Sequence, residues 1–543
     1  MTTAPDTASQ DIFYLALKSR DARFDGRFFT GVTSTGIYCR PVCKVKAPKR
    51  ENCHFFDLAA QAESAGFRPC LRCRPELAPN AGRWSIQDAS ATLAHQAARL
   101  LDEPEAWGDE VPSVAKLAAR MGVSDRHVRR IFEAQFGVSP LQYLQTRRLL
   151  TAKQLLTDTN MGVTRIALVS GFASIRRFNA AFVGHYKLNP TNLRRAGVAH
   201  AGQGSTVKLG FRPPYDVPAM LGFFSKRMLS SIEFVTSDDA ARHPQRLGKT
   251  LRIESGGKTH TGWLVADFDA ANSQVMLEVS DSLRDVLPLV IRRARAMFDL
   301  DADPMAINAV LHAGISPHQG VDREGISAPG IEMGGIRVPD MDMEGIRVPG
   351  CVDGYELAVR AVLGQQITVA AARTLAQRMV TRFGEAIETP YPELTRLFPA
   401  PAVLAQASGD ALGSLGIVKQ RQAAIVAIAQ CVASKRIHLH AGADVPATLA
   451  ALKELPGIGD WTAQYIAMRA LRWPDAFPAG DVALHKALGV QGSRTAARDA
   501  EALSQIWKPW RSYAVIRAWA SLPAPATRSA ATKAADGKSR PTR

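Results

Sequence analysis

Two pairs of closely spaced cysteines near the N-terminus constrain the fold more than any other feature of this chain. Three residues separate Cys39 from Cys43, and two separate Cys70 from Cys73. Two such pairs that converge on one ion give the tetrahedral four-thiolate coordination typical of structural zinc. The sequence therefore predicts a small N-terminal domain in which these four side chains bind one zinc ion. The alternative is that they are small buried thiols without a metal.

The other three cysteines show no comparable pattern. Cys53 lies between the two pairs, and Cys351 and Cys431 are isolated, so we expect all three to be packed side chains. Seven cysteines is an odd number, and a secreted disulfide scaffold would pair its cysteines and be far smaller. The first ten residues have neither the basic start nor the apolar core of a secretory signal. These features predict a protein of the reducing cytoplasm.

The charge of the chain indicates a polyanionic partner. Its 543 residues include 67 Lys and Arg against 50 Asp and Glu, which gives a net charge of +17. An excess of this size suits nucleic acid or an anionic membrane surface. No apolar run approaches the roughly 20 residues of a membrane-spanning helix. We therefore expect double-stranded DNA as the partner and no membrane.

The length and patterning of the chain predict several domains. A chain of 543 residues is too long for one hydrophobic core, so about three or four domains are expected. Short alternating runs predict strands in the middle of the chain, and three- and four-residue apolar spacing predicts helices on either side. The expected fold is multidomain, mainly α with α+β parts. The expected segments are a zinc domain (1–80), a helical domain (85–195), a small antiparallel-sheet α+β domain (207–300), a second helical domain (301–522) and a disordered basic tail (523–543).

Two further stretches are predicted to lie outside these domains or to interrupt them. Residues 199–205 are small and rich in glycine, as in a linker. Within residues 315–349, a pentapeptide at 335–339 recurs at 345–349, and its glycine and proline content predicts an extended insertion. We assign no chemistry to this insertion.

The first helical segment contains two helix-turn-helix patterns in tandem. In each, a short helix is followed by a glycine, a serine that can cap the next helix, and a helix that carries arginines. Such a unit places its second helix in the major groove of DNA, where arginine contacts base edges or phosphates. For any single arginine the alternative is a solvated helix face. The candidate DNA-binding side chains are Arg126, Arg129, Arg130, Arg176 and Arg177.

Residues 10–78 resemble the N-terminal domain of the Ada family, on both cysteine pairs and their neighbours at residues 35–43 and 65–70. The paired helix-turn-helix units resemble the AraC-type domain, which Ada also has in this position. In that family the first cysteine of the set accepts a methyl group from a methylphosphotriester in the DNA backbone, which implies this role for Cys39. The alternative is a purely structural zinc module. The second methyl-acceptor motif of Ada, Pro-Cys-His-Arg, does not occur in the sequence, so repair of O6-methylguanine is not implied.

The most specific motif of the chain is a glycine pair in residues 455–463. Gly457 and Gly459 flank one apolar residue, which predicts a tight hairpin between two helices whose N–H groups can face a DNA phosphate. With stretches such as residues 211–216 and 475–481, this helix-hairpin-helix makes residues 207–522 resemble the AlkA family, 3-methyladenine DNA glycosylase II.

The AlkA resemblance assigns the catalytic carboxylate to Asp481. A carboxylate there would stabilise the positive charge that develops on the sugar and orient water. The alternative is local, because Asp is also a favoured N-cap and residues 482–488 can begin a helix.

The resemblance also implies a pocket for a flipped, cationic alkylated base, which aromatic faces would hold by stacking and cation–π attraction. The corresponding residues are Phe223, Gln365, Trp461, Tyr465 and Trp519. Ordinary core packing is the alternative for the aromatic residues. Gln366 departs from the leucine that wedges into the duplex in relatives, so no wedge role is inferred. Strand-cutting relatives have a lysine at the position of Trp461, and an indole cannot form a Schiff base.

These features predict a DNA alkylation-repair protein that hydrolytically excises N-alkylated purines such as 3-methyladenine without cutting the strand. Methyl transfer to Cys39 and transcription regulation, with RNA polymerase as a further partner, are also predicted. The glycosylase chemistry needs no cofactor, and no small-molecule cofactor is expected. Two alternatives remain: a methylation-responsive regulator with a catalytically weak glycosylase-like half, and a zinc-stabilised structural DNA-binding protein.

Overall fold

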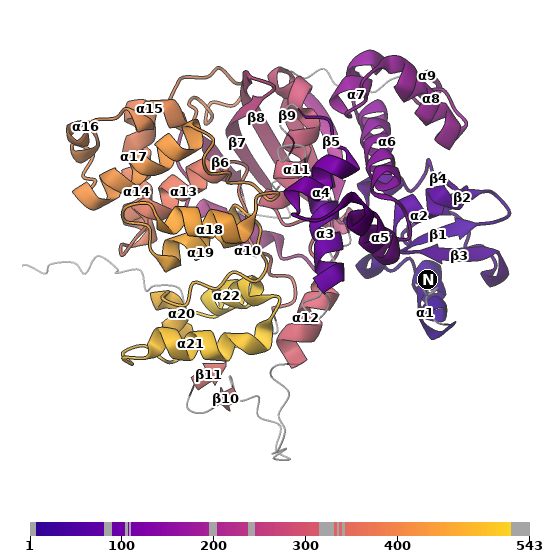
Figure 1. Ribbon diagram of the computed structural model, residues 1–543. Helices are drawn as coiled ribbons and strands as arrows, with labels where there is room; N and C mark the ends of the chain where they lie inside the picture. Colours follow the sequence, from indigo (N-terminus) through magenta and orange to yellow (C-terminus); the bar gives the residue numbers. More distant parts are fainter. Residues whose placement is uncertain are drawn as a thin grey trace, which may run out of the picture.

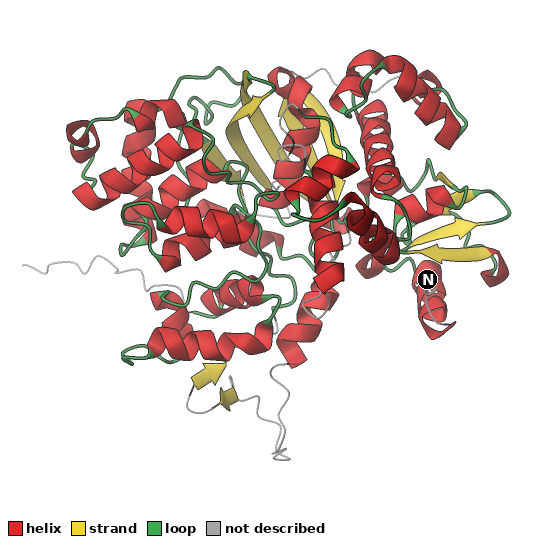
Figure 2. Cartoon of the chain, viewed as in Figure 1, coloured by secondary structure: helices red, strands yellow, loops and turns green. Residues whose placement is uncertain are grey.

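The computed structural model describes most of the chain (Figure 1). The described residues are 7–80, 89–103, 107, 110–194, 204–236, 245–313, 331–333, 336–338 and 343–522. The predicted tail lies outside them, as do residues 199–203 of the predicted linker and most of the predicted insertion. Figure 2 shows a mainly helical molecule with two larger groups of strands, which confirms the expected fold class. Within the described ranges, no helix is both long and apolar enough to cross a membrane.

The N-terminal unit is built around a four-stranded sheet in the order β3-β1-β2-β4. Its elements are α1 (Thr7–Ser19), β1 (Phe29–Val32), β2 (Ile37–Cys39), β3 (Cys53–Phe56), α2 (Ala59–Ser64) and β4 (Arg68–Pro69). Gly36 makes the β1–β2 turn with φ +64°, a conformation that favours glycine. Phe28, Cys53 and Phe55 pack in one cluster with side chains of α1, so Cys53 is a packed side chain as predicted. β2 and β4 are parallel neighbours, so the residues that follow them leave the same edge of the sheet.

Helices form the second unit, and both predicted helix-turn-helix patterns are present. Ser124 and Ser174 cap the second helix of each pattern, accepting hydrogen bonds from the N–H groups of His127 and Arg177. The long helix α6 connects the two patterns. The helices are α3 (Ala89–Asp102), α4 (Val114–Arg120), α5 (Asp125–Phe136), α6 (Pro140–Asp158), α7 (Val163–Val169), α8 (Ile175–Tyr186) and α9 (Pro190–Leu193).

The third unit is a five-stranded antiparallel sheet in the order β5-β9-β8-β7-β6. Its elements are β5 (Gly204–Gly210), α10 (Val217–Ser225), β6 (Glu233–Thr236), β7 (Arg246–Ser255), β8 (Lys258–Asp269), β9 (Gln274–Ser280) and α11 (Leu287–Met297). Buried and less buried residues alternate along β5 and β9, which is the period-two pattern of a strand with one face in the core. Figure 1 shows this sheet between the helix-turn-helix helices and the helices α13 to α17.

The C-terminal unit returns to helices, and α13, buried over nearly its whole length, packs against α17 and α19. The helices are α12 (Pro304–Ala313), α13 (Gly354–Leu363), α14 (Val369–Phe383), α15 (Pro401–Ala405), α16 (Gly409–Gly413), α17 (Lys419–Ala433), α18 (Val445–Lys453), α19 (Asp460–Arg469), α20 (Val482–Ala487), α21 (Ala496–Ser504) and α22 (Arg511–Ala520). Short 3-10 helices are Ala22–Phe24, Arg50–Asn52, Pro75–Leu77, Ala270–Asn272, Asp281–Val286 and Gln505–Trp507.

Two boundaries differ from the sequence-based expectation. Strand β5 begins at Gly204, inside the predicted linker, because it pairs with β9 over its whole length. The predicted insertion is also too long at its C-terminal end. Val348 is buried in a hydrophobic core, and Arg347 donates to the main-chain oxygen of Pro214 over 2.9 Å. Within the remaining insertion, β10 (Ile331–Met333) and β11 (Ile336–Val338) form an antiparallel pair.

Candidate metal centre and base-excision site

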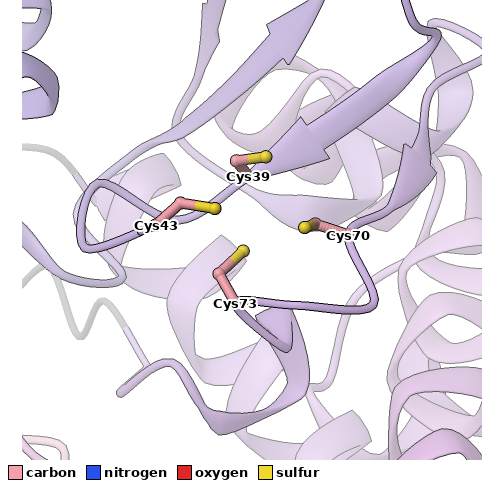
Figure 3. A group of neighbouring side chains, drawn as sticks. All are labelled: Cys39, Cys43, Cys70 and Cys73. Atoms are coloured by element: carbon pink, nitrogen blue, oxygen red, sulfur yellow. The ribbon is translucent and has the colours of Figure 1, made fainter. Parts of the chain in front are cut away.

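The four predicted metal ligands come from two loops at one edge of the N-terminal sheet. Cys39 ends β2 and Cys43 follows in the next turn, whereas Cys70 and Cys73 follow β4. Their four Sγ atoms all lie within 4.8 Å of one another. Figure 3 shows the four side chains pointing toward a common centre.

This arrangement fits a four-thiolate metal site. Zn–S bonds of about 2.3 Å place the sulfurs of a tetrahedral site roughly 3.8 Å apart, so a small contraction suffices. Hydrogen bonds with its three neighbours raise the pKa of Cys39, whereas the pKa of Cys43 is lowered to about 7, chiefly by its hydrogen bond with Cys39. The crowded thiols therefore resist ionising together, and a divalent cation at their centre would remove that conflict.

Arg40 supports the cluster from outside. Its backbone N–H donates to Cys73 Sγ over 3.3 Å, and its Nη1 donates to the main-chain oxygen of Cys73 over 3.0 Å. The guanidinium forms a buried ion pair with Asp25, which is 3% exposed. Outer contacts of this kind orient metal ligands. Neither residue was predicted from the sequence, because they are 15 positions apart and no local pattern brings them together.

Cys39 is not the most exposed residue of the cluster. Cys39, Cys43 and Cys70 are buried, and Cys73 is partly exposed. A methyl acceptor must reach the DNA backbone, so its role requires a duplex to come close to the end of β2. The assignment of Cys39 as the acceptor therefore rests on the family resemblance. Outside the cluster, Cys431 is buried and Cys351 partly buried, as expected for packed side chains.

The five predicted DNA-binding arginines are exposed on the second helices of the two helix-turn-helix units. On α5 the opposite face is buried through Val128, Ile131 and Phe132. On α8 the buried face is formed by aromatic side chains, including Phe178 and Phe182. Each unit thus presents a basic helix face to solvent. The arginines are Arg126, Arg129 and Arg130 on α5, and Arg176 and Arg177 on α8.

The predicted hairpin connects α18 to α19. Gly457 has φ +76°, and an added Cβ would lie 3.3 Å from the main-chain oxygen of Gln420. Gly459 is the N-cap of α19, which has no side-chain cap, and an added Cβ there would meet open space. The first N–H groups of α19 are therefore not covered by a capping side chain. Such a helix start can bind a phosphate.

Asp481 is both an N-cap and the centre of a polar cluster. Its Oδ1 accepts from the backbone N–H of Leu484 over 2.7 Å, which caps α20 as the structural alternative expects. Two indole N–H groups also donate to the carboxylate: Trp519 to Oδ1 over 2.9 Å, and Trp461 to Oδ2 over 2.8 Å. A helix cap requires only the first contact. The two tryptophans, 58 residues apart in sequence, fix the carboxylate in one orientation.

Two of the predicted aromatic residues, Trp461 and Trp519, contact this carboxylate, and Tyr465 packs beside them. Trp461 and Tyr465 are stacked with ring centroids 5.3 Å apart, and Trp519 lies 6.3 Å from Tyr465. All three, and Phe223, are partly exposed, which distinguishes them from the buried side chains of the core. Partly exposed aromatic rings next to a carboxylate can hold a planar cation by stacking and cation–π attraction.

Two arginines, neither of them predicted from the sequence, pack against these aromatic rings. The guanidinium groups of Arg227 and Arg469 lie 3.7 and 4.8 Å from the ring centroid of Phe223. Arg469 Nη1 also donates to the Tyr465 hydroxyl over 2.5 Å. Burial raises the pKa of Tyr465, but the charges of Arg469 and Arg227 outweigh burial and hold that pKa below its usual value. For Arg469 the available signal was its spacing of four residues from Tyr465 in α19, because such residues share one helix face. Arg227 lies beyond the end of α10, where helical spacing gives no such signal.

The amide nitrogen of Gln365 is engaged at the hairpin. Its Nε2 donates to the main-chain oxygen of Gly457 and to Thr462 Oγ1, both over 2.9 Å. The side chain thus ties the end of α13 to the hairpin and to the first turn of α19. Gln366 is exposed with φ +54°, a conformation uncommon outside glycine.

Sequence models of four protein families match the chain. They describe the metal binding domain of Ada (residues 13–76), a helix-turn-helix domain (117–196), the AlkA N-terminal domain (206–332) and the HhH-GPD superfamily of base excision DNA repair proteins (359–512). Together they match all four units of the fold.

Three relatives cover different parts of the chain. A probable bifunctional transcriptional activator/DNA repair enzyme AlkA from Mycobacterium tuberculosis is 35% identical over 94% of this chain and 96% of its own length. DNA-3-methyladenine glycosylase 2 of Escherichia coli is 31% identical over 57% of this chain and 95% of its own length. The bifunctional transcriptional activator/DNA repair enzyme Ada of Escherichia coli is 34% identical over 30% of this chain and 43% of its own length.

Proposed function

The chain belongs to the family of bifunctional Ada/AlkA-type DNA repair proteins, and we propose from this premise that it excises N-alkylated purines such as 3-methyladenine from DNA by hydrolysis. Membership of this family identifies the C-terminal half as a DNA glycosylase and DNA as the partner of the chain. We propose in addition which bases are excised, that the DNA strand is left uncut, and what the cysteine cluster does. Residues 7–194 are called the Ada-type half below, and residues 204–522 the AlkA-type half.

One observation carries the glycosylase proposal: two tryptophan N–H groups hold the carboxylate of Asp481 beside partly exposed aromatic rings. Loss of the base leaves positive charge on the sugar, and a fixed carboxylate stabilises that charge without having to reorganise. Asp481 would also orient the attacking water. N-alkylation makes the base cationic and already a good leaving group, so one carboxylate suffices.

The residues around Asp481 would bind the flipped base and the DNA backbone. The faces of Trp461, Tyr465 and Trp519 would hold the flipped cationic base, each contributing about 1–2 kcal/mol. The uncapped start of α19 would bind a phosphate near the lesion and keep the flipped nucleotide in register. Because Trp461 has no amine, the sugar forms no Schiff base with the protein, and the strand stays intact.

We further propose that the cysteine cluster binds one zinc ion and that Cys39 accepts a methyl group from a methylphosphotriester. Zinc, when bound, keeps the sulfurs as thiolates. The Cys39 sulfur attacks the methyl carbon, the new S–C bond forms as the C–O bond breaks, and the electron pair leaves on the phosphate oxygen. The product is an ordinary phosphodiester. The buried ion pair of Arg40 with Asp25, and the contacts of Arg40 with Cys73, would hold the loops of Cys39 and Cys73 in place during this exchange.

The basic faces of α5 and α8 support transcription regulation of the alkylation response, with RNA polymerase as the partner at a promoter. Their exposed arginines can read a duplex in two successive major grooves. All seven cysteines are free thiols, which suits the reducing cytoplasm and supports that location.

Incubating the full chain with an N-methylated DNA duplex tests the glycosylase proposal. We expect free 3-methyladenine to be released, with no nick before alkali treatment and no adduct after borohydride reduction. A borohydride-trapped adduct would contradict the role of Trp461. Intact DNA binding without base release would favour the alternative of a regulator with a catalytically weak glycosylase-like half.

A further inference from the structure

Arg212, in the loop after β5, is fully buried where the two halves of the chain meet. Its three nitrogens donate to five different main-chain oxygens over 2.7–3.0 Å. A guanidinium has five N–H donors, so the full set is used. The acceptors are the oxygens of Asp25, Pro79 and Asn80 in the Ada-type half, and of Asp301 and Ala302 in the AlkA-type half. We call this cluster the Arg212 junction.

The junction connects to the cysteine cluster through a short series of hydrogen bonds. Arg212 Nε donates to the main-chain oxygen of Asp25 over 2.7 Å. The carboxylate of the same Asp25 accepts from Arg40 Nε over 2.8 Å. Arg40 in turn donates to the sulfur and to the main-chain oxygen of Cys73. Only Asp25 and Arg40 therefore lie between Arg212 and a predicted metal ligand.

The main chains of the two halves approach closely around the junction. An added Cβ on Gly210, the last residue of β5, would lie 2.5 Å from the main-chain oxygen of Leu77. The N–H of Asn80 donates to Asp301 Oδ1 over 2.7 Å. At Gly210 the backbones are too close to admit a methyl group, although residues of both halves, Asn80 and Asp301 among them, also line a cavity beside the junction.

We propose that Arg212 is a positioning residue for the four-cysteine site, and that the AlkA-type half thereby supplies outer support for metal binding in the Ada-type half. The proposal rests on the zinc site proposed above. Outer contacts orient metal ligands, and their loss lowers metal affinity by about 10–100-fold. By linkage, metal binding stabilises the docking of the two halves as much as docking stabilises metal binding. The two halves thus act as one unit rather than as independent modules on a linker.

Two substitutions in the AlkA-type half test the coupling in the full-length chain. Gly210→Ala inserts a methyl group against the Leu77 oxygen and keeps the buried charge. Arg212→Lys also keeps a charge but offers three donors to five oxygens. The matched control is Gly222→Ala in α10, because an added Cβ there meets nothing within 4 Å.

The first readout is the rate at which a chelating dye extracts zinc from the purified proteins. We expect extraction on the order of tenfold faster from both variants than from wild type, and a wild-type rate for the control. The second readout is the absorption spectrum of the cobalt-loaded protein, which reports the geometry of the thiolates. A general loss of stability leaves the spectrum of the folded protein unchanged, whereas a change in the Arg40–Cys73 contact shifts it.

The outcomes separate the coupling from the metal proposal. If wild type takes up no zinc, the proposed metal site fails and the coupling fails with it. If wild type binds zinc but both variants keep the wild-type extraction rate and cobalt spectrum, only the coupling is refuted. Should Arg212→Lys not fold, Gly210→Ala decides by the same two readouts.

Discussion

Replacing Gln365 by leucine distinguishes two roles for this side chain. The family resemblance implies a place in the base pocket, whereas the structure commits its amide to the main-chain oxygen of Gly457 and to Thr462 Oγ1. Leucine has a similar volume and removes both hydrogen bonds. If the amide supports the hairpin, Gln365→Leu should weaken DNA binding. If it contacts the base, the substitution should slow base release.

The size of the effect follows from the two lost contacts. Each hydrogen bond between neutral groups contributes about 1 kcal/mol, and the Gly457 oxygen is left without this donor. If the whole loss of about 2 kcal/mol destabilises the DNA-binding conformation of the hairpin, the affinity for DNA falls by about 30-fold. The single-turnover rate of base release at saturating enzyme should change by less than about twofold, because no contact to Asp481 is altered.

The assay is a duplex-binding titration followed by single-turnover base release at saturating enzyme. Gln377→Leu is the matched control. Gln377 lies on α14, outside the hairpin, and its amide donates to the main-chain oxygen of Ser230. A variant of Gln365 with wild-type DNA affinity and slow base release would refute the hairpin role and restore the pocket assignment.

Three further predictions address the other sites. After incubation with DNA that carries methylphosphotriesters, mass spectrometry should show one added methyl group on the wild-type chain and on the control Cys53→Ser, but none on Cys39→Ser. Methylation of Cys39→Ser would exclude Cys39 as the acceptor. Arg129→Ala should reduce the salt dependence of operator binding by about one unit of slope if the arginine contacts a phosphate, and an unchanged slope and affinity would place it on a solvated face. Burial raises the pKa of Tyr465, but the charge of Arg469 outweighs it and lowers that pKa, so ionisation of Tyr465 stabilises the folded protein only as the pH rises through the lowered pKa. Arg469→Met should raise the pKa of Tyr465 in an ultraviolet titration, and an unchanged titration curve would contradict this role of Arg469.

Local sequence patterns were enough to predict most of the fold and the local structure around several candidate site residues. Cys39 and Cys73 are placed by the short spacing within each pair, because each spacing fits one loop. Ser124 caps α5, and Gly457 takes a positive φ in the hairpin, because both requirements arise within one turn of backbone. Asp481 needed the family resemblance, since its position at a helix start is also explained by capping.

The parts that could not be predicted depend on contacts between distant segments. Arg212 and Asp25 are 187 residues apart, and nothing near either residue marks the other. Arg347 lies in a stretch whose glycines and prolines favour an insertion, yet it is buried against the loop of Arg212. The role of Gln365 also escaped the sequence, because its position in a motif does not reveal which way the amide points.

Single-turnover release of 3-methyladenine by Asp481→Asn tests the central claim most directly. Asparagine also caps helices well, so the start of α20 and most of the DNA affinity should be retained. The control is Asp444→Asn, an exposed N-cap of α18 that accepts from Ala447 in the same way. We predict that Asp481→Asn slows base release by about 10²–10³-fold, while Asp444→Asn keeps the wild-type rate. Near-normal release by Asp481→Asn, with normal binding, would contradict catalysis by this carboxylate.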